Sequence, residues 1–562
     1  MKKILLLILL LFSLLVRARN LQEAYQEASS FFSSPSPTLR MPADPNRLLH
    51  VWTAVRTDGT PAFYVFNRGE KDGFAIISAD DRTHVILAYS ESGYFDADNL
   101  PDNAQKWLRR YLETIDAIPA DYSSQYTAQD KTYTPVTPIC TTQWGQYEPY
   151  NQLCPMERGK RCVTGCNVTA AAQIMKVHQY PATGTGSHSY YWHDRDGDST
   201  LLSVDFENTT YAWDLMQDNY WATSSTSAQQ AAVATLMYHC GVASEIKYTA
   251  DGSGTSSEKM CKAMIDHFGY DKGICVLLFD YMSEDAFIDS LAGELQAGRP
   301  VLMAGHTLED TGHAFVCDGM DADGLLHINW GWDGMSDAYF RVSALKPERQ
   351  GAGGSVGNYA FTQGICAFTH IQPDNNNHPC YTLTADEIGF DELRIKRTRE
   401  LRMHVDGFFN RSLYKWAGQL EVMLYKDNQL YDTYPYRSSL ALPPLYGYTR
   451  LEMSLSFQSL PIGEYELVLA HTMDESANSN KPIFVKGIGE YRCRMVVTSD
   501  SISLSLPQAN NDNPDLQALE PVFIDNSELQ YPKTRTTKLL RDGQLLIRRG
   551  DKTYTVTGQE VK

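Results

Sequence analysis

A cysteine that follows a glycine stands at the predicted start of a helix. Cys166 comes after Thr164 and Gly165 and opens a run of good helix formers that extends to about His178. The first N–H groups of a helix have no partner within it and the helix dipole is positive there, so a thiolate is stabilised. The pattern predicts a nucleophilic thiol, although a lone cysteine of this kind is more often a small apolar core residue.

A histidine and an asparagine that could serve this thiol lie well over a hundred residues downstream. His313 begins a short apolar strand pattern, and Asn329 and Trp330 end the next one. The order cysteine, histidine, asparagine is found in papain-like thiol proteases, where the histidine takes the thiol proton and returns it to the leaving amine. The asparagine holds the imidazole in one tautomer, and an adjacent indole would cover that hydrogen bond from water.

Four separated motifs in this chain resemble the streptopain family of secreted bacterial cysteine peptidases. They are residues 143–151, 164–176, 312–315 and 329–332, in that order. The resemblance covers about residues 45 to 370 and implies a pro-segment and a papain-like catalytic domain. It implies that Cys166 is the nucleophile and His313 the general base and acid. Gln146 would donate to the oxyanion, and Asn329 and Trp330 would orient and shield the histidine.

The role of Gln146 also follows from the chemistry of amide attack. The oxyanion that forms needs two preplaced hydrogen-bond donors, and the loss of one costs on the order of 10²- to 10³-fold in rate. The backbone N–H of Cys166 can be one donor, and a side-chain amide is the usual second. Gln143 is the competing glutamine, but Gln146 precedes the turn at 149–151 as the glutamine of the family does.

Two further positions resemble substrate contacts of that family. The small-residue loop 249–257 matches the segment that lines the non-primed side of the cleft, with Ser253 at the contact position. Gly312 is at the other contact, where a side chain would block the peptide backbone. The glycine-rich run 351–357 resembles the family's mobile loop over the active site, although any surface loop could have this composition.

The N-terminus has the pattern of a secretory signal peptide, residues 1–18. Two lysines precede an apolar run from Ile4 to Val16, which is shorter than the ~20 residues that span a bilayer. We expect cleavage near Ala18, with an uncleaved anchor as the weaker alternative. The protein is therefore expected to be secreted or attached to the cell surface, with no later transmembrane span.

Residues 19–135 are predicted to form an inhibitory pro-segment of α+β type. Strand patterns at 63–66, 73–78 and 85–90 precede an amphipathic helix at 104–115. The resemblance implies that this segment folds against the catalytic domain and keeps a zymogen inactive. Residues 119–135 are polar and unpatterned, as a cleavable linker should be, so maturation is expected between Ser123 and Thr137.

The papain-like catalytic domain is assigned to residues 136–372, and the chain then departs from the minimal streptopain pattern. Residues 373–379 mark a linker, and alternating strand patterns over 380–508 predict an antiparallel β-sandwich. The sandwich could be a spacer, a surface-binding module or a stabilising partner. Residues 530–562 indicate a hairpin tail that resembles the C-terminal signals of proteins exported by the type IX route of Bacteroidetes. The fold class expected for the whole is α+β.

Composition and cysteine usage restrict the remaining possibilities. A chain of 562 residues suggests three or four domains, and a net charge of −19 argues against nucleic-acid binding. If Cys166 stays free, ten of the eleven cysteines remain, and the pairs to test first are Cys154–Cys162 and Cys366–Cys380.

Metal binding is not indicated by the cysteine spacing or by the acidic loops. The cysteines lack the paired spacing of a zinc site, and the acidic loops 194–198 and 318–324 lack the terminal glutamate of an EF-hand. No cofactor and no metal are predicted for the catalytic site, and binding of calcium by the acidic loops stays open.

The sequence favours a secreted cysteine endopeptidase, made as a zymogen, that hydrolyses proteins through an acyl-thioester on Cys166. A transglutaminase-like acyltransferase on the same Cys–His dyad is a second hypothesis. A non-catalytic surface-binding protein on a peptidase scaffold is a third, against which the joint presence of Cys166, His313, Asn329 and Gln146 argues. Protein or peptide substrates and the chain's own pro-segment are the expected partners.

Overall fold

The computed structural model describes residues 18–33, 48–118, 131–305, 313–343, 365–436, 439–473 and 476–507, together with four strands between residues 536 and 561. The chain divides into two compact units, Met1–Asn511 and Asp512–Lys562. Several predictions lie outside the described residues: the signal peptide up to residue 17, Gly312, the glycine-rich run 351–357 and most of the expected cleavage range.

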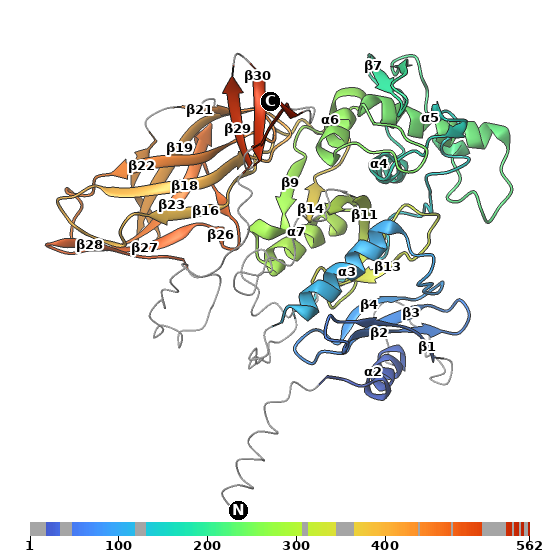
Figure 1. Ribbon diagram of the computed structural model, residues 1–562, viewed down its shortest axis with the longest axis horizontal. Coiled ribbons are helices and arrows are strands. Elements are labelled where there is room, and N and C mark those ends of the chain that lie inside the picture. The colour runs from blue at the N-terminus through green and yellow to red at the C-terminus, as the bar shows by residue number, and fades with distance from the viewer. Residues whose placement is uncertain are drawn as a thin grey trace, which may run out of the picture. The chain divides into compact units, whose positions relative to one another are not determined.

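The N-terminal region, residues 18–118, is a four-stranded antiparallel sheet with one helix on each face (Figure 1). Its elements are α2 (Leu21–Ser33), β1 (Leu48–Val55), β2 (Pro61–Arg68), β3 (Phe74–Ser78), β4 (Ile86–Ser90) and α3 (Asp102–Asp116). Phe63 and Val65 of β2 share a core with α3, whereas Tyr64 and Phe66 share a core with α2. Because successive side chains of a strand point to opposite faces, an unbroken apolar strand is buried on both sides.

The sheet of the N-terminal region continues without a break into the central region, residues 131–371. The central strands are β9 (Cys275–Leu278), β10 (Val301–Gly305), β11 (His313–Met320), β12 (Leu326–Asn329), β13 (Ala338–Phe340) and β14 (Cys366–Thr369). The ten strands follow the order β1-β2-β3-β4-β13-β12-β11-β10-β14-β9. The junction is the antiparallel pair β4–β13, in which Tyr89 is opposite Tyr339 and Ala88 is opposite Phe340.

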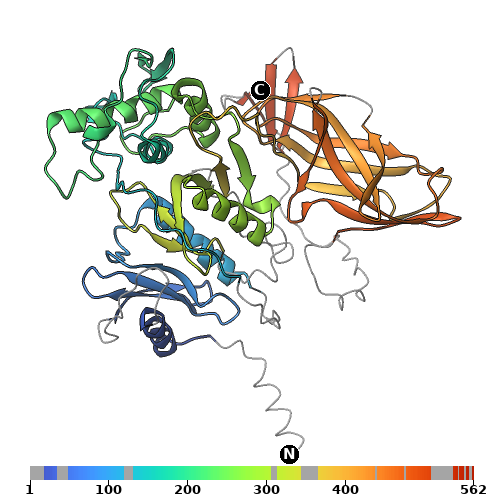
Figure 2. The ribbon, with the colours of Figure 1, turned by 180° about the vertical axis from the view of Figure 1, so that it is seen from behind.

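Helices cover both faces of the central strands (Figure 1, Figure 2). They are α4 (Cys166–His178), α5 (Ser227–Ala243), α6 (Ser257–Phe268) and α7 (Glu284–Gln296). Leu302 and Ala304 of β10 share a core with α4, whereas Val301 and Met303 share a core with α7 and with α3 of the N-terminal region. The N-terminal region therefore contributes both strands and a covering helix to the central fold.

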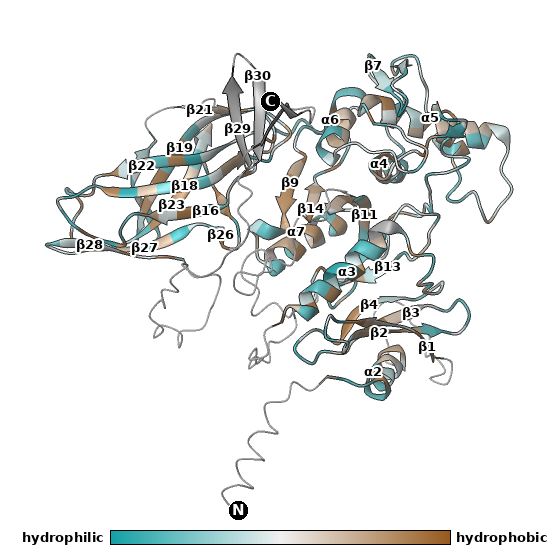
Figure 3. Cartoon of the chain, in the orientation of Figure 1, coloured by the Kyte–Doolittle hydropathy of each residue, from teal (hydrophilic) through white to brown (hydrophobic). Residues whose placement is uncertain are grey.

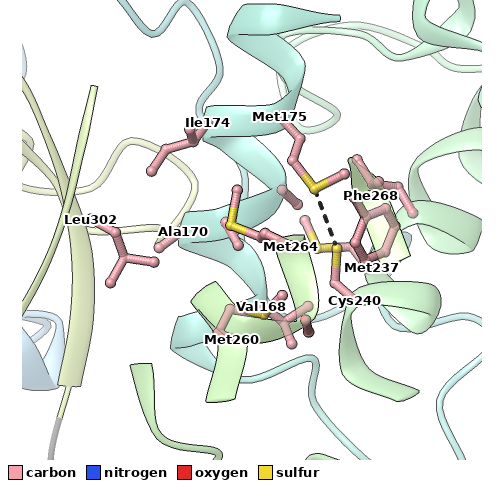
Figure 4. Close-up of a cluster of buried hydrophobic side chains, with 14 of the residues drawn as sticks. Val168, Ala170, Ile174, Met175, Met237, Cys240, Met260, Met264, Phe268 and Leu302 are labelled. Atoms are coloured by element: carbon pink, nitrogen blue, oxygen red, sulfur yellow. Dashed lines mark hydrogen bonds between the residues drawn. The ribbon is translucent and has the colours of Figure 1, made fainter. Parts of the chain in front are cut away.

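The helix that begins at Cys166 is the most enclosed helix of the central region. All residues from Asn167 to Met175 are buried in α4. Figure 4 shows the side chains that surround it, with Met237 and Cys240 from α5, Met260, Met264 and Phe268 from α6, and Leu302 from β10 gathered around Val168, Ala170, Ile174 and Met175. The thiol of Cys240 contacts the thioether sulfur of Met175 at 3.7 Å. A helix buried on all sides places its first residue with little freedom.

Residues 372–507 form the predicted β-rich C-terminal region. Its strands are β15 (Leu383–Ala385), β16 (Glu387–Phe390), β17 (Arg394–Lys396), β18 (Leu401–Asn410), β19 (Trp416–Lys426), β20 (Gln429–Pro435), β21 (Leu440–Leu442), β22 (Gly447–Leu455), β23 (Gly463–Met473), β24 (Ser476–Pro482), β25 (Phe484–Val485), β26 (Gly489–Glu490), β27 (Arg492–Val497) and β28 (Ser501–Ser505). They build a six-stranded and an eight-stranded sheet that share one core. The period-two alternation that predicted strands is visible along β18 in Figure 3.

The junction between the central and C-terminal regions differs from the open linker that the sequence predicts. Asp271 accepts hydrogen bonds from the backbone N–H of Asn375 (2.7 Å) and from the side-chain amide of Asn377 (3.0 Å). A disulfide joins Cys275 of β9 to Cys380. The polar composition of this stretch therefore reflects satisfied turns against the central region.

Neither of the two cysteine pairs singled out for testing from the sequence forms a disulfide. Cys154, Cys162 and Cys366 are buried free thiols, and Cys380 pairs with Cys275. The strands explain the error for Cys380. In the antiparallel pair β14–β9, Cys366 lies opposite Leu278, and the opposite end of β14 lies beside Cys275. The chain leaves β14 at that end, so Cys380 returns close to Cys275.

The second unit contains four strands in an antiparallel meander, β29 (Thr536–Arg541), β30 (Gln544–Arg549), β31 (Lys552–Thr555) and β32 (Glu560–Val561). The predicted hairpin is its first pair, in which Leu539 lies opposite Leu546. A role as an export signal stays a prediction. Across the described part of the chain, no helix is long and apolar enough to cross a membrane.

Candidate active site

Cys166 is the first residue of α4, and its side chain lies against the start of β11. Its sulfur accepts a hydrogen bond from the backbone N–H of Ala314 at 3.3 Å, and Ala314 directly follows His313. Gly165 precedes the helix with φ of +88°, and a Cβ at this position would lie 2.7 Å from the carbonyl oxygen of Ser253. Only glycine fits such a turn without strain. The structure thus brings the predicted nucleophile to the strand that carries the predicted histidine.

The N–H groups of Cys166 and Asn167 at the helix start lower the pKa of the Cys166 thiol, as predicted, but burial acts in the opposite direction. Burial raises its pKa above the ordinary value, and this effect outweighs the backbone hydrogen bond from Ala314 and the positive charge of Lys106, which lower the pKa. Lys106 belongs to α3 of the N-terminal region. The difference arises because the local prediction takes no account of what covers the helix start.

The N-terminal region packs α3 over the strands that carry the site. The ring of Trp107 contacts those of Phe315 and Trp330 at centroid distances of 5.7 and 5.9 Å. The hydroxyl of Tyr111 donates to the carbonyl oxygens of Leu87 (2.9 Å) and Arg341 (2.5 Å), so one side chain ties β4 to the end of β13. The N-terminal region therefore packs against Phe315 and Trp330 beside the site.

Asn329 ends β12, beside the strand that begins with His313. It lies opposite Val316 in the β11–β12 pair and is buried. Its side-chain amide nitrogen donates to the carbonyl oxygen of Thr142 (2.8 Å), and its oxygen accepts from the side-chain amide of Gln173 and from the N–H of Gly331, both at 3.0 Å. The structure places Asn329 on the strand next to the one that begins with His313. A hydrogen bond between Asn329 and the imidazole stays a prediction.

Trp330 is almost completely buried under α3. In addition to Trp107, its ring contacts Phe315 at 5.0 Å and Phe340 at 5.2 Å. Its indole N–H donates to the carbonyl oxygen of Ser336, and its backbone N–H donates to the carboxylate of Asp337. These two hydrogen bonds hold Trp330 in place through its backbone and its side chain. The predicted role of Trp330, to shield the hydrogen bond between Asn329 and His313 from water, stays a prediction.

Gln146 lies beside the loop that leads into Cys166. Gln146 is buried, and its backbone carbonyl oxygen accepts a hydrogen bond from the backbone N–H of Thr164 at 3.2 Å. Gln143, the competing glutamine, packs its side chain against Gly334, where a Cβ would lie 2.8 Å from the glutamine amide. The role of Gln146 as the oxyanion donor stays a prediction.

Ser253 braces the nucleophile loop with its side chain. Its hydroxyl donates to the carbonyl oxygen of Val163 at 2.6 Å and accepts from the backbone N–H of Thr249 at 2.9 Å. The hydroxyl is thus used inside the protein, and a substrate contact at this position would be made by the backbone. That contact stays a prediction, as does the one at Gly312, which lies outside the described residues.

Sequence reasoning missed two buried polar residues of α4 that connect the site to its surroundings. Asn167 donates to the carbonyl oxygen of Thr255 (2.8 Å) and accepts from the hydroxyl of Ser257 (2.7 Å), so it ties the helix start to the loop after Ser253. Gln173 bridges Thr142 and Asn329. The available signal was a polar amide in a helix segment otherwise made of alanine, valine, threonine, isoleucine and methionine.

Among the described residues, no group of three or more histidine, cysteine or acidic side chains is arranged to hold a metal ion.

Comparisons with known proteins show which family the chain belongs to. Residues 144–340 match the model of the peptidase C10 family, and residues 16–115 match that of the Spi protease inhibitor. Streptopain of Streptococcus pyogenes is 30% identical over 317 residues, which are 53% of this chain and 77% of streptopain. The chain belongs to the peptidase C10 family. It is therefore a cysteine-type peptidase with an N-terminal inhibitor domain.

Other members of the C10 family extend the comparison. The thiol protease/hemagglutinin PrtT of Porphyromonas gingivalis is 33% identical over 372 residues, 64% of this chain and 42% of PrtT, so the chain matches less than half of that relative. A prointerpain A fragment of Prevotella intermedia is 33% identical and covers 58% of this chain and 98% of the fragment, with a TM-score of 0.49. Active interpain A is 35% identical over 44% of this C10 peptidase, with a TM-score of 0.37.

Proposed function

We propose that this C10 peptidase is an exported endopeptidase, made as a zymogen, that hydrolyses proteins through Cys166 and His313. The observation that carries the proposal is the hydrogen bond from the N–H of Ala314 to the sulfur of Cys166. It brings the first turn of a buried helix to the first residues of β11, where the histidine stands. These are the elements that a thiol–imidazole pair requires.

Each proposed step uses a residue of this chain. His313 takes the proton of the Cys166 thiol, and the sulfur attacks the carbonyl carbon of the scissile peptide. The backbone N–H of Cys166 and the amide of Gln146 stabilise the oxyanion. His313 then protonates the leaving amine, and a water activated by the same imidazole hydrolyses the thioester. Asn329 holds the imidazole in the tautomer that these transfers need.

The zymogen part of the proposal rests on how the N-terminal region is attached. Its sheet is paired with the catalytic sheet through β4 and β13, and α3 covers Trp330 with Trp107 and brings Lys106 near Cys166. The pKa of the thiol is raised in this state. A substrate would have to compete with α3 for the side of the site that Phe315 and Trp330 form, and on this basis the region is proposed to act as an intramolecular inhibitor.

Cleavage of the connecting segment is proposed to occur before Lys131. The expected range reached Thr137, but the backbone beyond Lys131 is paired with the catalytic region. The N–H groups of Tyr133, Val136 and Ile139 donate to the carbonyl oxygens of Ala322, Met320 and Asp318 at 2.8–2.9 Å. A protease acts most readily on exposed, unpaired backbone, so the scissile bond is placed between residues 123 and 131.

Export is part of the proposal. The signal-peptide pattern at residues 1–18 and the four-stranded tail at 536–561 would act as two successive export signals. The second would direct the protein to the type IX route. Removal of the tail from an expressing bacterium that has this route should leave the protease inside the cell envelope. An unchanged amount in the medium would exclude the tail as an address.

The decisive experiment compares residues 19–562 with the Cys166→Ala variant. Self-shortening and casein cleavage are expected in the first only and should be abolished by a thiol alkylator. His313→Ala should be inactive, with His327→Ala as the matched histidine control. Activity that survives in Cys166→Ala would exclude the proposed nucleophile. If a labelled primary amine becomes attached to casein faster than casein is cut, the enzyme is an acyltransferase.

The oxyanion donor is tested by a matched pair of glutamines. Gln146→Ala is expected to lower kcat on the order of 10²- to 10³-fold, whereas Gln143→Ala should keep most of it. The opposite ranking would move the donor to Gln143.

A further inference from the structure

The nucleophile helix contains one fully buried amide two turns after Cys166. Gln173 has 0% of its surface exposed, and its neighbours in α4 are alanine, isoleucine and methionine. A buried amide is costly unless its polar atoms are hydrogen-bonded. Its oxygen accepts from the hydroxyl of Thr142 (3.0 Å) and from the N–H of Trp144 (3.3 Å), and its nitrogen donates to the oxygen of Asn329 (3.0 Å). Both ends of this side chain are therefore occupied.

Backbone groups fix which way both amides point. The N–H of Trp144 can only donate, so the atom of Gln173 that faces it is the oxygen, and the nitrogen faces Asn329. The carbonyl oxygen of Thr142 can only accept, so the nitrogen of Asn329 faces Thr142. The N–H of Gly331 faces the oxygen of Asn329 and agrees with this choice. A flipped Asn329 would set two N–H donors against its own nitrogen.

These bonds close a ring that joins three parts of the site. Thr142 lies on the segment that leads to Gln146, Gln173 lies on the helix that begins at Cys166, and Asn329 ends β12. Thr142 bonds to Gln173 through its hydroxyl and to Asn329 through its carbonyl oxygen, while Gln173 bonds directly to Asn329. The elements carrying the proposed oxyanion donor, nucleophile and imidazole-orienting amide therefore share one buried contact.

We propose that Gln173 is a positioning residue for catalysis, which acts by holding the side-chain amide of Asn329 in a fixed place beside the nucleophile helix. This inference rests on the proposed function, in which Asn329 orients His313. Without the Gln173 donor, Thr142 and Gly331 still set which way the amide of Asn329 points, but the amide loses its direct link to the nucleophile helix and is held less firmly. Its interaction with the imidazolium is then weaker, so the charged form that protonates the leaving amine is less stable.

The test uses the full chain after self-processing, with kcat based on the number of thiols that react with an alkylating titrant. Gln173→Met keeps the length of the side chain and removes its hydrogen bonds. We expect kcat to fall about tenfold, as for the loss of one buried hydrogen bond, with KM within about twofold of its starting value. The alkaline limb of the pH profile of kcat/KM should move to lower pH, because a less stable imidazolium loses its proton earlier.

Gln173→Glu separates positioning from packing. The carboxylate still accepts from Thr142 and Trp144, but it faces the oxygen of Asn329 with another acceptor. We expect it to lower kcat at least as much as Gln173→Met. Gln152→Met is the matched control, since Gln152 donates its single described side-chain bond to Gln230. It should leave kcat and the pH profile unchanged.

Asn329→Ala and the double variant distinguish failure of this inference from failure of the proposed function. If Gln173 acts through Asn329, adding Gln173→Met to Asn329→Ala should cause little further loss. If Asn329→Ala keeps full activity, the proposed role of Asn329 fails although peptide hydrolysis stands. If Asn329→Ala loses activity while Gln173→Met does not, the role of Gln173 is refuted. Failure of both Gln173 variants to give a titratable thiol would make Gln173 a folding residue and also refute the proposal.

Discussion

If residues 18–118 inhibit the enzyme as proposed, Trp107→Ala should expose the proposed active site in the uncleaved chain. Trp107 is 3% exposed, and its ring contacts Phe315, Trp330 and Phe340, all in the catalytic region. Its indole N–H also donates to the carbonyl oxygen of Arg341 at 3.2 Å. This side chain therefore connects the inhibitor to the enzyme more than it stabilises the inhibitor itself.

The size of the effect follows from the burial of the ring. Truncation of a buried tryptophan to alanine costs about 3 to 5 kcal/mol. Because the described aromatic partners of Trp107 are on the catalytic side, most of that loss weakens docking of α3. With a factor of ten for about 1.4 kcal/mol, the undocked fraction should rise on the order of 10²- to 10³-fold.

Alkylation of Cys166 measures this fraction. The eight other free cysteines, all within the described residues, are buried, so a bulky maleimide added to the folded chain reports the one thiol that is partly exposed. His313→Ala as a background keeps the thiol and prevents self-processing. The initial labelling rate at low reagent should rise by the same 10²- to 10³-fold when labelling requires undocking.

Trp52→Ala is the matched control, because the ring contacts described for Trp52 are to Phe63 and Phe95, within the inhibitor itself. It should lower the stability of the inhibitor domain and change the labelling rate far less. Equal acceleration in the two variants, or none in Trp107→Ala, would refute the view that α3 seals the site through this residue.

Three further predictions concern stability. Both ring nitrogens of His471 are buried without a hydrogen-bond partner among the described residues, so His471→Leu should raise the thermal midpoint of the C-terminal region; a clear fall in calorimetry would contradict this. Burial lowers the pKa values of His178, His239 and His471 to about 4, below the unfolded value, so the unfolded chain binds more protons between about pH 6.5 and 4 and stability should fall as pH falls through that window. Urea midpoints that stay constant from pH 7.5 to 5 would contradict it. Replacing Cys275 and Cys380 by serine opens a link between residues 105 apart and should cost about 2 to 4 kcal/mol in urea unfolding, with an unchanged midpoint as the contrary result.

Local patterns in the sequence predicted local elements well. The amphipathic pattern at 104–115 corresponds to α3 (Asp102–Asp116), and the strand patterns at 73–78 and 85–90 correspond to β3 (Phe74–Ser78) and β4 (Ile86–Ser90). Such patterns depend on which side of an element is apolar, and residues close together in the sequence determine this. The pairing of β4 with β13 brings together residues 250 apart, as in Tyr89 and Tyr339, and no local pattern specifies it.

In the candidate site, too, local features could be predicted from the sequence and features that depend on distant residues could not. The helix start at Cys166 and the strand start at His313 were recognisable from residue types in order. The raised pKa of the thiol was not, because it arises from burial of the sulfur in the folded chain. The disulfide between Cys275 and Cys380 and the bridging role of Gln173 likewise depend on which strands and helices meet in the fold.

The sheet shared by inhibitor and enzyme determines what maturation leaves behind. Separation would break the β4–β13 ladder and create two open edges with unpaired backbone groups. The enzyme would keep β13, only three residues long, and very short edge strands resist pairing with other chains. The inhibitor would leave with β4, five residues long and almost wholly apolar. The open edge that can pair with strands of other chains is therefore β4, on the released inhibitor. After cleavage, the inhibitor fragment should aggregate more readily than the enzyme.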